Sequence, residues 1–243
     1  MYDFEKALEK IQTLRETPTL GNYMPALRML TTFLDQASIR NLREELARGL
    51  LHRGILHMHR HERASEDNET FLAQYFSDIQ AGLQICRRHD LGAIEAQLER
   101  RMGDYYYEIG DDQEACVHYQ MAIQLLPEKN RTGIRHTEYT APLYRCEVLA
   151  APNASLLKLL ADDLRIASRK PKQMPQWQWL IIRAGVALKY AEAAHAVDST
   201  SPLCGKLMQK AQADAERLDR MGYHQRLIQV RRLKRKLGFL DSF

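Results

Sequence analysis

Apolar residues recur every three to four positions along almost the whole chain. In the first segment, Phe4, Leu8, Ile11 and Leu14 fall at this spacing, which places them on one face of a helix near 3–15. No stretch alternates apolar and polar residues between turns, as a strand of a sheet would. The pattern predicts an all-α protein of about eleven helices, mostly arranged as antiparallel pairs.

Capping residues and breakers set the expected helix ends in the first half of the chain. Asn22 is a favourable N-cap for a second helix, in which Pro25 is tolerated because the first turn has no N–H partners. Ser38 is the expected cap of a third helix that continues to His61. Residues 63–69 contain no apolar side chain larger than Ala and are predicted to form an exposed loop. Helices near 70–88, 91–108 and 112–126 follow.

The second half shows the same signals. Pro142 should interrupt or begin a helix within residues 134–150. Asn153 or Ser155 can cap the next helix, and a long apolar helix is expected from residue 176 to about 197. Ser201 precedes a proline at the first helical position of another helix, which should end at Gly222. A final helix is predicted over about 223–237.

Residues 96–129 carry the motif with the greatest specificity. Small and aromatic residues, a turn and a closing proline stand at fixed spacing: Gly103, Tyr106, Ala115, Tyr119, Ala122 and Pro127. This segment resembles the tetratricopeptide repeat (TPR), although Glu99 and Met102 stand where that family usually has Trp and Leu. The resemblance implies one helical-repeat domain over residues 1–243, built as a right-handed α-solenoid of helix pairs.

A TPR-like superhelix implies a concave groove lined mainly by the first helix of each pair. By the geometry of the family, the groove residues of this repeat are Gln97, Arg101, Asp104, Tyr107 and Glu108. They do not reproduce the carboxylate clamp of chaperone-binding TPRs. The resemblance implies a non-catalytic adaptor or scaffold that binds a protein or peptide. Because the repeats look longer than the standard period, an alternative is a regulatory sensor, like the helical sensor domains of bacterial transcription activators. Such a sensor would bind a small molecule or peptide signal and act on a nucleic-acid-linked partner.

Positive charge is concentrated at the C-terminal end of the chain. Residues 204–243 carry ten Lys or Arg and four Asp or Glu, so their charge is +6, against +4 for the whole chain. An apolar stripe of Leu227, Val230, Leu233, Leu237 and Leu240 favours a basic capping helix within residues 223–243. The basic side chains could also contact an acidic partner, either nucleic acid or an anionic surface: Arg231, Arg232, Lys234, Arg235 and Lys236.

Histidines form the main group of possible metal ligands: His52, His57, His59 and His61. His57 and His61 share a helix face, but no carboxylate is placed to complete a site, so we predict neither a metal nor another cofactor. His52 and His59 would face the groove if Gly54 corresponds to Gly103. Catalytic motifs such as a Gly-rich phosphate loop, a nucleophile elbow or HExxH are absent from the sequence. We therefore expect no enzymatic activity.

The four cysteines are widely separated, at Cys86, Cys116, Cys146 and Cys204. They form no CxxC pair, and free buried thiols in a reducing compartment are expected. The 30-residue interval between the first three is interpreted as coincidence, because the flanking residues do not match. The N-terminus does not resemble a secretory signal, and no apolar run has the roughly 20 residues of a membrane span. These features predict a cytoplasmic protein.

Overall fold

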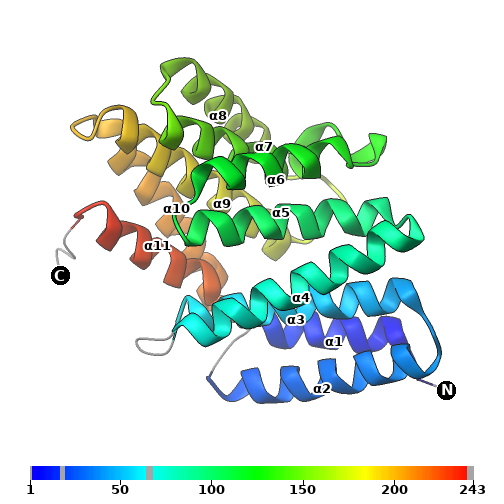
Figure 1. The fold of residues 1–243 in the computed structure, drawn as a ribbon. Coiled ribbons are helices and arrows are strands. Elements are labelled where there is room, and N and C mark those ends of the chain that lie inside the picture. Colours follow the sequence, from blue (N-terminus) through cyan, green and yellow to red (C-terminus); the bar gives the residue numbers. More distant parts are fainter. Residues whose placement is uncertain (1, 17–19, 64–67, 240–243) are drawn as a thin grey trace.

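The computed structural model describes residues 2–16, 20–63 and 68–239. Within these residues the chain forms eleven α-helices and one short 3₁₀ helix and no strand, so the predicted all-α class is confirmed (Figure 1). The helices are α1 (Phe4–Glu16), α2 (Leu20–Ile39), α3 (Arg43–His61), α4 (Asn68–His89), α5 (Gly92–Glu108), α6 (Asp112–Gln124), η1 (Glu128–Asn130), α7 (Gly133–Ala150), α8 (Ala154–Ala167), α9 (Gln176–Val197), α10 (Pro202–Arg220) and α11 (Gln225–Lys236).

Helices that follow one another in the sequence also pack against one another. The most extensive contacts join α3 with α4, α5 with α6, and α9 with α10. Helix α7 packs on α6, α8 and α9, and α11 lies against α10 and α9. Figure 1 shows the result as a succession of helices from α1 and α2 to α8, with α11 at its side. The largest apolar cluster joins α7, α8, α9, α10 and α11.

The α5–α6 pair contains the small-to-large contact that the TPR spacing predicts. A Cβ placed on Gly103 would lie 2.7 Å from Cε1 of Tyr119, so only glycine allows this close approach of the two helices. Ala115, Tyr119 and Ala122 are fully buried. The α3–α4 pair repeats the arrangement, because a Cβ on Gly54 would lie 2.9 Å from Cδ1 of Ile79.

Glu99 takes the position where the TPR consensus has tryptophan, and its side chain is completely buried. Arg87 donates a hydrogen bond to one carboxylate oxygen at 2.6 Å, and His118 lies 2.7 Å from the other. Burial opposes ionisation, yet the hydrogen bonds from His118 and Arg87 hold the pKa of Glu99 below its usual value. A buried carboxylate paired with Arg87 and His118 therefore occupies this position.

Two predicted caps in the first half of the chain are wrong. Helix α2 begins at Leu20, so Asn22 lies inside the helix, and it extends to Ile39, so Ser38 lies in its last turn. Helix α3 begins only at Arg43, after Asn41, whose φ of 58° is left-handed. An asparagine in this conformation ends a helix, and the sequence analysis did not use that signal. The break before Asn22 and most of the predicted loop fall outside the described residues, at 17–19 and 64–67.

Pro142 does not interrupt its helix, because α7 continues through it without a break. Its missing N–H costs one hydrogen bond, but Pro142 is buried where α7 packs on α6, α8 and α9. The packing on three neighbours holds the helix intact at that position. Other predicted caps are confirmed: the side chains of Asn153 and Ser201 accept N-cap hydrogen bonds, and Gly222 ends α10 with φ of 88°.

Asp163 on α8 provides a test of the packing between α7 and α8. Its carboxylate accepts a hydrogen bond from Oγ1 of Thr140 at 2.7 Å, and burial raises its pKa to about 6. The folded protein therefore binds a proton more tightly than the unfolded chain, and this group removes about 2–3 kcal/mol of stability as the pH rises from 4 to 7. We expect Asp163→Asn to have a higher unfolding free energy than the wild type at pH 8, but a similar one near pH 4.

Urea unfolding followed by circular dichroism at both pH values measures this difference. Asp162→Asn is the matched control, because it removes the same charge from the neighbouring, exposed position. An equal pH dependence in Asp163→Asn and the wild type would contradict the assignment.

Candidate functional site

A cavity of about 1290 Å³ is the main concave feature of the described part of the chain. Its lining residues come from α1, α3, α5, α7, α9 and α11, together with η1 and short connecting segments. Among the even-numbered helices, only α4 contributes a residue, Tyr75. The first helices of successive pairs therefore face one common space, which the C-terminal helix also borders.

The cavity is strongly basic. Of the described residues, twelve Lys or Arg and five Asp or Glu line it, an excess of seven positive charges. The entire chain carries only +4, so the rest of the protein is on balance negative. Charge is therefore concentrated inside the cavity, where the surrounding protein screens it less than bulk water does.

All five predicted groove residues line this cavity, and they make contacts within the protein. Arg101 donates to Asp104 at 2.9 Å, and Asp104 also accepts from the Tyr119 hydroxyl at 2.8 Å. The Gln97 side chain donates to the carbonyl of Ala93 at 3.3 Å. The Arg101 side chain is only 27% exposed. The cavity wall is an ordered polar network.

Tyr107 contacts three charged side chains at one end of the cavity. Its hydroxyl donates to Glu192 at 2.5 Å and accepts from Lys236 at 3.1 Å. The guanidinium of Arg145 lies 3.4 Å from the centre of its ring, a cation–π contact. Burial raises the pKa of Tyr107 to about 12, so the phenol remains protonated and donates.

Two of the five basic residues predicted on the last helix form ion pairs inside the protein. Arg232 donates to Glu108 at 2.5 Å, and Lys236 donates to Glu192 at 2.7 Å. Among the residues that the structure describes, Arg231, Lys234 and Arg235 form no ion pair. Val230 and Leu233 of the predicted stripe are buried, and Leu240 lies outside the described residues. The helix thus packs with one face and extends basic side chains from the other.

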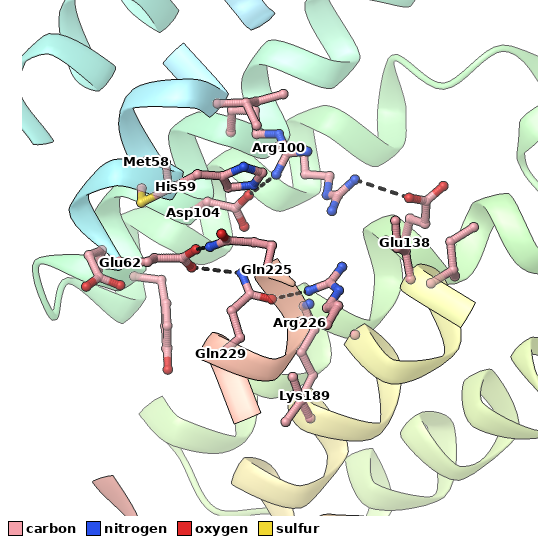
Figure 2. A pocket seen from close by; sticks show the side chains of 18 of the residues that line it. Met58, His59, Glu62, Arg100, Asp104, Glu138, Lys189, Gln225, Arg226 and Gln229 are labelled. Carbon is pink, nitrogen blue, oxygen red and sulfur yellow. Dashed lines mark hydrogen bonds and ion pairs between the residues drawn. The ribbon is translucent and has the colours of Figure 1, made fainter. Parts of the chain in front are cut away.

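Contacts between α11 and the end of α3 were not predicted from the sequence. Gln229 donates to Glu62 at 2.8 Å, and Gln225 also donates to Glu62 (Figure 2). Arg63 donates to Gln225 at 2.8 Å. These partners are more than 160 positions apart in the sequence. Only a pattern of glutamines on the polar face of the last helix could have suggested them.

The four histidines that the sequence places close together contact different side chains in the structure. His57 lies 3.1 Å from the Tyr23 hydroxyl and 3.7 Å from Asp78, whereas His61 lies 3.0 Å from Glu108. Burial lowers the pKa of His57, so its neutral form is favoured. His52 and His59 both line the cavity. In the described ranges no three His, Cys, Asp or Glu side chains gather closely enough to hold a metal ion.

The two tryptophans point in different directions, as their spacing predicts. Trp177 lines the cavity and stacks on Tyr223, with ring centres 5.2 Å apart and an angle of 8° between the planes. Trp179 instead donates its indole N–H to the carbonyl of Ala167 at 2.8 Å and packs against the largest apolar cluster. An aromatic wall therefore stands beside the basic residues.

Cys116 of α6 and Cys146 of α7 belong to one cluster between these helices, and their thiols form a hydrogen bond. Arg145 also lies 3.6 Å from Sγ of Cys146. A hydrogen bond from Cys116 lowers the pKa of Cys146 to about 7, with Arg145 acting in the same direction. All four cysteines are free, but Cys116 is only half-buried, which corrects the expectation of buried thiols.

No protein-family model matches the chain, and no curated protein matches it significantly. In the described ranges, no helix combines the length and the apolar character that crossing a membrane requires.

The ion pairs of α11 can be tested by removing their charge. We expect Arg232→Gln with Lys236→Gln to lower the free energy of unfolding by about 1–2 kcal/mol, because half-buried Glu108 and buried Glu192 each lose a donor. Urea unfolding measures the loss. Arg231→Gln with Lys234→Gln is the control from the same helix, and the idea is wrong if the two double variants are equally stable.

The thiol pair can be tested by titration of thiolate absorbance at 240 nm. The wild type should show a transition near pH 7 that belongs to Cys146. Cys116→Ala removes the hydrogen-bond donor and should move this transition to higher pH. Cys204→Ala is the control, since burial raises the pKa of Cys204 and that thiol should not contribute near pH 7. A transition that persists unchanged in Cys116→Ala would disprove the pairing.

Proposed function

We propose that the protein is a non-catalytic adaptor that binds an acidic segment of a partner protein in the basic cavity. In this proposal the helices form a right-handed TPR-like solenoid with α11 as its basic C-terminal cap. The lining by α1, α3, α5, α7 and α9 supports this arrangement, because the first helices of TPR pairs face the groove. The same arrangement is the basis for expecting a peptide or protein as ligand.

The excess of positive charge in the cavity carries the proposal. Five carboxylates line the cavity, and all five already accept hydrogen bonds from protein groups: Glu62, Asp104, Glu108, Glu138 and Glu192. They balance fewer than half of the twelve cations. A ligand rich in Asp or Glu would supply the missing negative charge, and the potential of the cavity would accelerate its association.

The size of the cavity favours a peptide over a small-molecule signal. Pockets for drug-sized ligands enclose about 300–1,000 Å³, and this cavity is larger, at about 1290 Å³. Aromatic rings accompany the charges along its wall, including the stacked Trp177 and Tyr223. A segment with acidic and apolar side chains would match both kinds of surface.

The contacts of α11 favour a protein partner over nucleic acid. Arg232 and Lys236 are already paired with Glu108 and Glu192, so the helix does not present a continuous row of available cations. Nucleic-acid binding depends on many simultaneous phosphate contacts. Of the other cations of α11, Arg226 and Arg235 line the concave space, which suits an inserted peptide segment.

Binding of a fluorescent Asp/Glu-rich peptide, followed by anisotropy, tests the proposal. The triple variant Lys129→Gln, Arg135→Gln and Arg235→Gln removes three cations from the cavity wall. We expect it to weaken binding at least tenfold, and we expect wild-type affinity to fall as salt rises from 50 to 300 mM.

The matched control is Arg88→Gln, Lys158→Gln and Lys172→Gln, which removes equal charge from exposed positions outside the cavity. It should bind as the wild type does. An equal loss of affinity in both triple variants would mean that only net charge matters. Failure of every acidic peptide to bind would contradict the proposed function.

A further inference from the structure

Four cations from four helices reach one region of the cavity. They are Arg100 of α5, Arg145 of α7, Lys189 of α9 and Arg226 of α11, called the cationic cluster below. Figure 2 shows Arg100, Lys189 and Arg226 entering the same space from different helices. Burial and the guanidinium groups of Arg145, Arg226 and Arg100 lower the pKa of Lys189 well below that of an ordinary lysine.

The position of Arg226 depends on the absence of a side chain on α9. A Cβ on Gly185 would lie 2.9 Å from Nη2 of Arg226, so the guanidinium occupies the space that any other residue would fill. Gly185 stands one helical turn before Lys189, on the same face of α9. The glycine therefore allows two like charges to lie close together, an arrangement that folding alone would disfavour.

The carboxylates around the cluster are engaged mainly by other groups. Asp104 binds Arg101 and the Tyr119 hydroxyl, and Glu138 binds Arg135 at 2.9 Å. Arg100 lies 3.7 Å from Glu138, and Arg145 lies 3.7 Å from Glu192, both beyond hydrogen-bonding distance.

Two donors of the cluster have no acceptor. Among the described residues, the buried Nε atoms of Arg100 and Arg145 have no hydrogen-bond acceptor, and the carboxylate that acts favourably on Lys189 is Asp104, which already binds Arg101. Buried polar groups are normally paired, so unpaired donors beside a cavity point to a missing acceptor. The required acceptor carries several oxygens and more than one negative charge.

We infer that the cationic cluster is a subsite for a phosphoryl group on the bound segment, an inference that rests on the proposed function. A phosphorylated side chain has a charge of about −1.5 to −2 at neutral pH and three strong acceptor oxygens. Guanidinium groups match these oxygens with paired N–H donors, and an ammonium adds a point charge. A single carboxylate would supply fewer oxygens and only half of that charge.

Inorganic phosphate is the first probe. Isothermal titration calorimetry of the full chain compares phosphate with acetate and chloride at equal ionic strength. We expect phosphate to bind in preference to both, and Lys189→Gln to weaken this binding about tenfold. Arg226→Gln should also weaken it, which provides a second variant if Lys189→Gln fails to fold. Arg88→Gln is the matched control, because it removes one cation from an exposed position outside the cavity, and it should bind phosphate as the wild type does.

A peptide series tests whether the phosphoryl group belongs to a protein segment. Three acidic peptides differ at one central position, which is serine, glutamate or phosphoserine. On the wild type we expect the phosphoserine peptide to bind about tenfold more tightly than the glutamate peptide. In Lys189→Gln this difference should disappear, while the affinity for the serine peptide changes little.

The outcomes separate this inference from the proposed function. If the acidic peptides bind equally and phosphate does not bind, the subsite is wrong and the adaptor proposal stands. If phosphate binds through Lys189 but no peptide binds, the adaptor proposal is wrong. A nucleoside monophosphate that binds through Lys189 more tightly than the phosphopeptide would overturn the assignment of the phosphoryl group to a protein segment.

Discussion

The burial of the Arg145 guanidinium is the interaction on which the centre of the structure depends. This side chain, 8% exposed, lies over the Tyr107 ring of α5 at 3.4 Å and within 3.7 Å of Glu192 of α9. It also reaches the Tyr119 hydroxyl of α6 at 3.4 Å. A buried charge is costly unless other groups compensate for it, so these three helices must keep fixed positions around α7. The wall of the cavity and the centre of the fold are therefore one polar network.

The same network explains how the C-terminal helix belongs to the cavity. Lys236 donates a hydrogen bond to Glu192, which also lies within ion-pair distance of Arg145. Arg232 donates a hydrogen bond to Glu108, which also contacts His61. Because each carboxylate joins two helices, loss of α11 would leave buried negative charge as well as exposed apolar surface at Val230 and Leu233. Helix α11 is thus held by ion pairs of Arg232 and Lys236 and by the burial of Val230 and Leu233.

Local signals in the sequence were sufficient for the helices and for one close contact between two of them. Periodicity located eleven helices, and the spacing of Gly103 and Tyr119 identified a close helix–helix contact. The prediction that Ser38 begins the third helix was wrong, because α2 continues past it and ends only before the left-handed Asn41. The predicted helix interruption at Pro142 was wrong, because the packing of α7 on three helices outweighs one lost hydrogen bond.

The cavity itself required long-range information. Family geometry placed all five expected groove residues on its wall, but not their partners, since Tyr107 and Glu192 are 85 positions apart. Likewise, the sequence did not predict the contact between the thiols of Cys116 and Cys146, because only the packing of α6 on α7 brings them together. Pairwise contacts between distant helices carry no local signature in one sequence.

The charge in the cavity is larger than stability requires. Ion pairs such as Arg183–Asp214 satisfy both of their members and connect α9 with α10. Lys189 and Arg226 are like charges that lie close together near Gly185, so they form no ion pair with each other. Their repulsion lowers the stability of the folded chain. An apolar residue at 189 would remove that repulsion. Side chains that lower the stability of the fold by charge repulsion, and that line a cavity and not the core, are typical of ligand-binding residues.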